Sequence, residues 1–158
     1  MALAQRRPYG IYRLLANAPR WFYRLHLGWL LGHRVVQITH RGRKSGVLRR
    51  TILEVLSYDP KSREILVVSG WEGKTDWYRN IEQEPALEVR IGRVHYRPVQ
   101  EFLSPQETTE LILTLFRTHP REVRFVGPLL GIDPDADEAD LRARLEAFFR
   151  GVRFHPAS

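Results

Sequence analysis

The sequence contains no cysteine, and so it can form neither a disulfide nor a thiolate metal site. It also lacks any uncharged apolar run of about 18 residues, the length that a membrane-spanning helix requires. Arginines interrupt every apolar run near the N-terminus, and we therefore expect no cleaved export signal. These absences favour a cytoplasmic protein without a transmembrane helix.

Acidic residues are missing from the first third of the chain. Residues 1–53 contain eleven arginines and lysines but no aspartate or glutamate. The other 105 residues carry 14 basic side chains against 18 acidic ones, a net charge of −4. The overall charge of +7 therefore belongs to the N-terminal third. Such an asymmetry favours an anionic partner: a nucleic acid, a membrane surface or a phosphorylated ligand.

Several motifs that identify common chemistries are also absent. The six histidines show no metal-ligand spacing and no H-E-x-x-H pair, so no metal site is expected. No G-x-S-x-G elbow, phosphate-binding loop or G-x-G-x-x-G fingerprint occurs. The sequence therefore gives no support to a serine hydrolase of that type, a P-loop nucleotidase or a Rossmann dehydrogenase.

What is present indicates one α+β domain. We expect a single domain over residues 1–158, with basic amphipathic helices at 1–31, a barrel core at 34–103 and C-terminal helices at 104–158. Segments rich in β-branched residues predict strands at 34–40, 47–58 and 64–70, and a hairpin around Gly92. Thr75 can cap a short helix, and Ser104 with Glu107 forms a capping box before a longer one. These elements predict a small, mostly antiparallel barrel with helices at both chain ends.

Residues 9–31 combine apolar and basic side chains at helical spacing. Trp21, Leu25 and Trp29 recur every four residues, and arginines lie beside this stripe. Such a helix can pack on the domain with its arginines in water, or it can lie on an anionic membrane surface. The spacing leaves both interpretations open, including peripheral contact with the inner face of the membrane.

The stretch HRGRKSGVLRRT, residues 40–51, is the strongest candidate for an anion site. Its two glycines, Gly42 and Gly46, can adopt the positive φ of a tight corner between two strands. Arg43, Lys44 and Ser45 then present a guanidinium, an ammonium and a hydroxyl at that corner, a combination suited to phosphate oxygens. On the following strand, residues 49 and 51 share one face and residue 50 takes the other, where we expect it to be solvated. A basic turn is also typical of an ordinary exposed corner.

A second candidate stretch is VVSGWEGKTDWYRN, residues 67–80. Ser69 and Gly70 close a strand, and the following loop leads to a helix N-terminus that can face an anion or a carbonyl. Trp77 and Tyr78 supply flat apolar surfaces for an aromatic ring system. The alternative is that both belong to the core of a short helix.

Taken together, GRKSG-x-x-R-R-T, a strand ending in Ser-Gly and D-W-Y-x-N resemble the deazaflavin-dependent nitroreductase family. The resemblance covers roughly residues 20–105. It implies a split β-barrel of the FMN-binding type that binds coenzyme F-420, an 8-hydroxy-5-deazaflavin. It also implies hydride transfer between the reduced coenzyme and a small acceptor such as a quinone, an enone or a nitro compound.

The resemblance further implies roles for particular residues. The phosphate and polyglutamate tail of the coenzyme is expected at the corner and the arginine after it, namely at Arg43, Lys44, Ser45, Gly46, Arg49 and Thr51. The deazaflavin ring is expected beside Ser69, Gly70, Trp77 and Asn80. No spacing selects a catalytic acid among Tyr58, Tyr78 and His40, so the catalytic residue stays unassigned.

The sequence is also compatible with other functions. A nucleic-acid-binding protein would use the basic third of the chain, but the arginines are spread over a predicted helix and a turn without a known reading module. A related split barrel could use FMN or haem. Split barrels of this kind are often homodimers, and we leave that state open.

Overall fold

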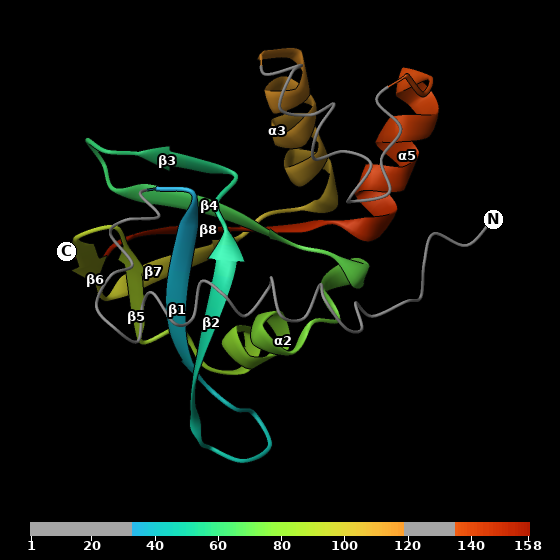
Figure 1. Ribbon diagram of the computed structural model, residues 1–158. Helices are drawn as coiled ribbons and strands as arrows, with labels where there is room; N and C mark the ends of the chain where they lie inside the picture. The colour runs from blue at the N-terminus through green and yellow to red at the C-terminus, as the bar shows by residue number, and fades with distance from the viewer. Residues whose placement is uncertain (1–32, 119–134) are drawn as a thin grey trace, which may run out of the picture.

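Two four-stranded antiparallel sheets form the centre of the protein (Figure 1). The structure is a computed structural model, and it describes residues 33–118 and 135–158. The helices expected within 1–31 lie outside the described residues. The described elements are β1 (Val35–Arg41), β2 (Leu48–Glu54), β3 (Ser57–Asp59), β4 (Glu64–Ser69), η2 (Trp71–Gly73), α2 (Asp76–Gln83), β5 (Glu88–Ile91), β6 (Val94–Tyr96), β7 (Pro98–Phe102), α3 (Pro105–Thr118), α5 (Glu138–Phe148) and β8 (Arg150–Pro156).

The first sheet has the strand order β2-β1-β5-β6, and the second has the order β3-β4-β8-β7. The chain passes from one sheet to the other directly after β2. The N–H of Val55 donates to the carbonyl of Arg34 at the edge of the first sheet, at 2.8 Å. The next N–H, that of Leu56, donates to Leu66 in the second sheet, at 2.8 Å. The predicted strand 47–58 is therefore two strands, because two adjacent peptides bond to different sheets.

The core lies between the sheets and is made by alternate residues of their strands. On β1 the side chains of Val36, Ile38 and His40 point inward, and each is at most 1% exposed. They meet inward-facing side chains of the other sheet and of α2. The other members of this core include Ile65, Val67, Trp77, Tyr78, Ile81, Val89, Ile91, Val152 and Phe154. Burial of one such large apolar side chain contributes about 1.5–3 kcal/mol.

The last strand corrects the expected division of the chain. We expected the barrel core to end at residue 103 and the C-terminal part to be helical, but β8 lies between β4 and β7 in the second sheet. Its Val152 and Phe154 are fully buried. Gly151 is required there because a Cβ would lie 2.9 Å from the hydroxyl of Thr108 on α3. The barrel thus includes residues from near the C-terminus.

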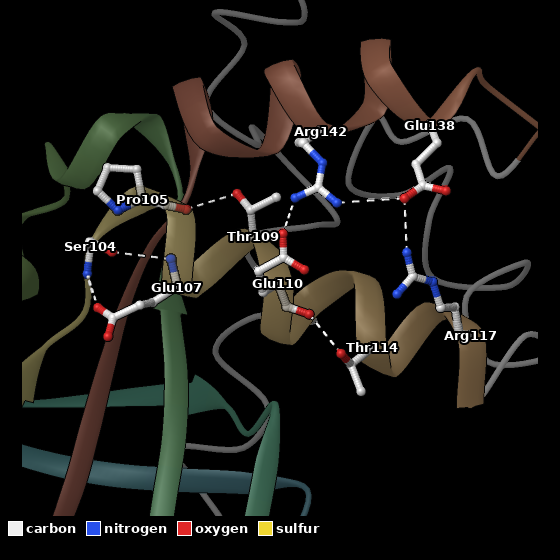
Figure 2. Close-up of polar contacts among 9 residues, drawn as sticks. All are labelled: Ser104, Pro105, Glu107, Thr109, Glu110, Thr114, Arg117, Glu138 and Arg142. Atoms are coloured by element: carbon white, nitrogen blue, oxygen red, sulfur yellow. Dashed lines mark hydrogen bonds and ion pairs between the residues drawn. The ribbon is translucent and has the colours of Figure 1, made fainter.

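The helices α3 and α5 pack on each other beside the second sheet (Figure 1). Figure 2 shows the predicted capping box at the start of α3: the N–H of Ser104 donates to Glu107 at 2.9 Å, and the N–H of Glu107 donates to the Ser104 hydroxyl at 3.1 Å. On the exposed side Arg142 of α5 pairs with Glu110 of α3. Arg117 of α3 in turn pairs with Glu138 of α5. These contacts fix the two helices to each other.

Candidate functional site

The GRKSG stretch forms the tight turn between β1 and β2. Two backbone hydrogen bonds close the turn, from the N–H of Gly42 to Val47 at 2.9 Å and from the N–H of Gly46 to Gly42 at 2.8 Å. Gly46 has a φ of +67°, as expected for this corner. Gly42 has no positive φ and is needed for a different reason. A Cβ there would lie 2.7 Å from the Ser45 hydroxyl and 3.2 Å from Nε of Arg49.

This turn, the first two strands and α2 together enclose a cleft of about 810 Å³. Most of its lining residues carry positive charge or hydrogen-bond donors, and Asp76 is its one acidic member. The lining consists of Thr39, His40, Gly42, Arg43, Lys44, Ser45, Leu48, Arg49, Arg50, Thr51, Asp76, Trp77 and Asn80. The surplus of cations makes the cleft suitable for an anionic ligand.

Arg43 ties the turn to α2. Both its backbone N–H and its Nη1 donate to Oδ1 of Asn80, at 3.1 and 2.9 Å. Its Nη2 also pairs with the carboxylate of Asp76 at 3.1 Å. The side chain of Arg43 is only 21% exposed, whereas that of Asp76 is 88% exposed. Arg43 therefore holds the corner against the helix, and part of its donor capacity is already used.

The remaining cations of the cleft are differently placed. Lys44, Arg49 and Arg50 are exposed, and no described residue makes a hydrogen bond or an ion pair with their side chains. The Ser45 hydroxyl accepts from the N–H of Val47 at 3.3 Å, which leaves its own hydrogen available. These groups can meet a ligand without first breaking a contact inside the described part of the protein. Arg50 lines the cleft as well, although we expected it to be in solvent.

A buried histidine joins the floor of the cleft to α2. Nε2 of His40 lies 2.9 Å from the hydroxyl of Thr51, and Nδ1 lies 3.2 Å from the amide nitrogen of Asn80. Burial lowers the pKa of His40 below its ordinary value, and the nearby charge of Arg49 lowers it further. His40 is therefore neutral at physiological pH.

Of the four residues expected beside the ring, only Trp77 and Asn80 line the cleft. Ser69 is buried, and its hydroxyl lies 2.6 Å from the hydroxyl of Thr75. This contact also explains why Thr75 precedes α2 without forming a side-chain cap. Gly70 packs against Phe148 of α5, since a Cβ would lie 2.9 Å from that ring. Ser69 and Gly70 shape the loop rather than the cleft.

The three candidate proton donors lie in different places. Tyr78 is buried against Trp77 and Phe102, and burial raises its pKa. Tyr58 lies on β3 of the second sheet, outside the cleft lining. Among these three, His40 alone lines the cleft.

Sequence reasoning missed four of the lining residues, Thr39, Leu48, Arg50 and Asp76. The position of Asp76 in the first turn of a predicted helix was the available signal, because that helix end was already expected to face a ligand. Within residues 33–118 and 135–158, no group of three or more potential metal ligands gathers at one place. No helix of these ranges has the length and apolar character needed to cross a membrane.

Solved structures resemble this chain in fold. The F420-H2 dependent reductase FDR-A is 16% identical, and the match covers 78% of this chain and 96% of that one with a TM-score of 0.50. The protein Atu2129 of Agrobacterium tumefaciens, of unknown function, is 15% identical over 99% of this chain and 60% of its own, also with a TM-score of 0.50. No curated protein matches the sequence. These structural matches confirm the predicted α+β split β-barrel.

The family comparison identifies the coenzyme. Residues 19–123, more than half of the 158, match the family described as F420H(2)-dependent quinone reductase. Both the predicted coenzyme F-420 and the predicted oxidoreductase activity are thereby confirmed. The chain belongs to the F420H(2)-dependent quinone reductase family.

Proposed function

We propose that the cleft between the β1–β2 turn and α2 holds the phosphorylated, polyglutamate tail of F-420. The observation that carries the proposal is the set of exposed cations, Lys44, Arg49 and Arg50, for which the described residues supply no counterion. The tail is polyanionic, and charged donors at a partly enclosed cleft bind phosphate and carboxylate oxygens strongly. The donor set of the cleft therefore fits this coenzyme.

Some residues of the site bind the coenzyme tail, and others fix the shape of the turn. Lys44, Arg49 and the Ser45 hydroxyl contact the tail, with Thr51 beside them. Arg43 acts mainly as an anchor, because its guanidinium already bonds to Asn80 and Asp76. It contributes positive charge to the cleft from that fixed position. Gly46 allows the turn itself.

The ring end of the site is proposed near Trp77, where the polar cleft meets the apolar core. The reduced deazaflavin supplies a hydride when bound. The chain contributes orientation through the tail contacts and an apolar wall through Trp77. A quinone is the acceptor class that fits this family.

Fluorescence titration with F-420 tests the proposal directly. Each charge-assisted hydrogen bond contributes about 1.5 kcal/mol, so Lys44→Ala or Arg49→Ala should weaken binding about tenfold. Lys61→Ala is the matched control, since Lys61 is exposed in the β3–β4 turn on the other sheet. Equal affinities for all three variants and the wild type would refute the tail assignment. Mass spectrometry of any small molecule released from the purified protein distinguishes F-420 from FMN and haem.

We also propose a cytoplasmic homodimer that contacts the inner membrane surface through residues 9–31. The pattern of Trp21, Leu25 and Trp29 with neighbouring arginines supports the membrane contact. Co-sedimentation with anionic liposomes should be lost in a truncation lacking residues 1–31. Equal sedimentation of both proteins would exclude this contact.

Analytical ultracentrifugation tests the homodimer, and a monomer mass at all concentrations would rule it out.

A further inference from the structure

His40 occupies an unusual place for a polar side chain. It follows Val36 and Ile38 on the inward face of β1 and is 1% exposed. Both ring nitrogens nevertheless have partners, Thr51 on β2 at 2.9 Å and Asn80 on α2 at 3.2 Å. A buried polar side chain with two defined partners fixes the orientation of both.

The contacts of Asn80 determine which way its amide points. Two donors, the N–H and Nη1 of Arg43, approach the same amide atom at 3.1 and 2.9 Å. An amide nitrogen cannot accept hydrogen bonds, so that atom must be the oxygen Oδ1. The amide nitrogen of Asn80 therefore faces His40, as a donor.

The direction of the amide in turn fixes the tautomer of His40. Because the Asn80 nitrogen can only donate, Nδ1 of His40 must accept. A neutral imidazole carries its single hydrogen on the other nitrogen, and Nε2 therefore donates to the oxygen of Thr51. The Thr51 hydroxyl then keeps its own hydrogen for another acceptor, and Thr51 lines the cleft.

We propose that Asn80 and His40 are positioning residues that hold the Thr51 hydroxyl as a hydrogen-bond donor to the ligand in the cleft. This inference rests on the proposed function, because the ligand is the coenzyme assigned to the same cleft. The chain of contacts starts at Arg43 and passes through Asn80 and His40 to Thr51. The same asparagine thus fixes the basic corner through its oxygen and a hydroxyl donor through its nitrogen.

Asn80→Asp is the decisive variant. A carboxylate retains the acceptor for Arg43 but offers His40 no donor, and it raises the pKa of His40. At a pH where His40 is neutral, the His40 hydrogen should therefore move to Nδ1. Nε2 would then accept from Thr51, and the hydroxyl hydrogen would turn away from the ligand. In ¹⁵N NMR spectra of the ligand-free protein, recorded at a pH where His40 is neutral, we expect His40 protonated on Nε2 in the wild type and on Nδ1 in Asn80→Asp. His95, which is exposed and has the carboxylate of Glu88 at 4.0 Å from its Nδ1, serves as a reference for a solvent-exposed imidazole.

The added negative charge of Asn80→Asp would itself weaken binding of an anion. We therefore measure F-420 affinity for Asn80→Asp in the Thr51 and in the Thr51→Val backgrounds. The loss caused by Asn80→Asp should be at least about threefold larger when Thr51 is present, because only then is a donor redirected. Thr51→Ser keeps the hydroxyl and should restore wild-type affinity to within about threefold.

Three results would overturn the inference. These are a wild-type His40 protonated on Nδ1, equal losses for Asn80→Asp in both backgrounds, or a Thr51→Val variant that binds F-420 as the wild type does. The NMR measurement uses protein without coenzyme, and so it tests the tautomer even if the tail binds elsewhere. Failure of the proposed function has a different signature, namely wild-type affinity in Lys44→Ala and Arg49→Ala. Thr51→Val also keeps the test available if Asn80→Asp does not fold.

Discussion

Arg43 is expected to act on stability as well as on coenzyme binding, whereas its neighbour Lys44 acts on binding alone. Arg43→Ala removes the guanidinium bond to Asn80 at 2.9 Å and the ion pair with Asp76 at 3.1 Å. The bond from the charged donor to Asn80 contributes about 1.5 kcal/mol. The pair with Asp76 adds only about 0.5 kcal/mol, because that carboxylate is 88% exposed and screened by water.

The expected loss for Arg43→Ala is thus about 2 kcal/mol in the free energy of unfolding. For a domain of this size the melting temperature should fall by about 4–8 °C. Lys44→Ala is the control, since no described residue contacts its side chain through a hydrogen bond or ion pair, and its stability should change by less than about 0.5 kcal/mol.

Urea denaturation followed by tryptophan fluorescence measures both variants, and F-420 titration measures their affinities. Arg43→Ala should lose stability and affinity together, while Lys44→Ala should lose affinity only. Identical unfolding midpoints for Arg43→Ala and the wild type would refute the anchoring role. A large loss of stability in Lys44→Ala would show that the two cations are not distinguished as we infer.

Three further predictions concern the fold and its pH dependence. Phe154→Ala should lower the free energy of unfolding by about 3–5 kcal/mol in urea denaturation, because this ring is fully buried in β8. Truncation of Val99, which is 44% exposed, should lower it far less. Similar losses for the two variants would contradict the placement of β8. Ser104→Ala should cost about 1 kcal/mol by breaking the capping box before α3, and an unchanged midpoint would argue against that cap. Burial, and then the charge of Arg49, lower the pKa of His40 in the folded state. As the pH falls, His40 is therefore protonated in the unfolded chain, at its ordinary pKa of about 6.5, before it is protonated in the folded protein. The stability that neutral His40 contributes is complete above that pH and is lost as the pH falls toward the pKa of the folded state. Between pH 7 and pH 5 the wild type should therefore lose more stability than His40→Gln. Parallel pH profiles of the two proteins would exclude this linkage.

Local sequence patterns predicted the elements that short-range chemistry determines. The first strands, the turn at Gly46 and the box formed by Ser104 and Glu107 all depend on neighbouring residues. The resemblance to a deazaflavin family likewise depended on residues within one continuous region. For such features the local pattern and the final contacts agree.

Features that depend on distant contacts were missed or misassigned. Nothing near Val55 indicates that the chain changes sheets there, because both halves of the predicted strand have suitable β-branched residues. Thr75 seemed to be a helix cap, but its hydroxyl lies against Ser69. Asp76 enters the cleft because Arg43 lies across from it, 33 positions earlier in the chain. Each of these depends on how separate elements pack, which periodicity does not record.

The candidate site was predicted in part for the same reason. The cations of the turn are adjacent in sequence, and their placement together follows from one hairpin. The expected ring neighbours come from a strand end and a helix start, and the structure brings Trp77 and Asn80 to the cleft but not Ser69 and Gly70. Which of these face a ligand depends on the packing of Phe148 from a distant helix.

The position of β8 has a consequence for how this protein folds during its synthesis. All strands of the first sheet lie between Val35 and Tyr96, so that sheet can assemble while the ribosome is still adding the later helices. In the second sheet, Arg150–Pro156 lies between β4 and β7 and pairs with both. Until these residues are present, β4 and β7 each have an unpaired edge. These residues are synthesised after every other described strand. The nascent chain must therefore carry the unpaired edges of β4 and β7 until β8 has been made, and it is most exposed to aggregation in that interval.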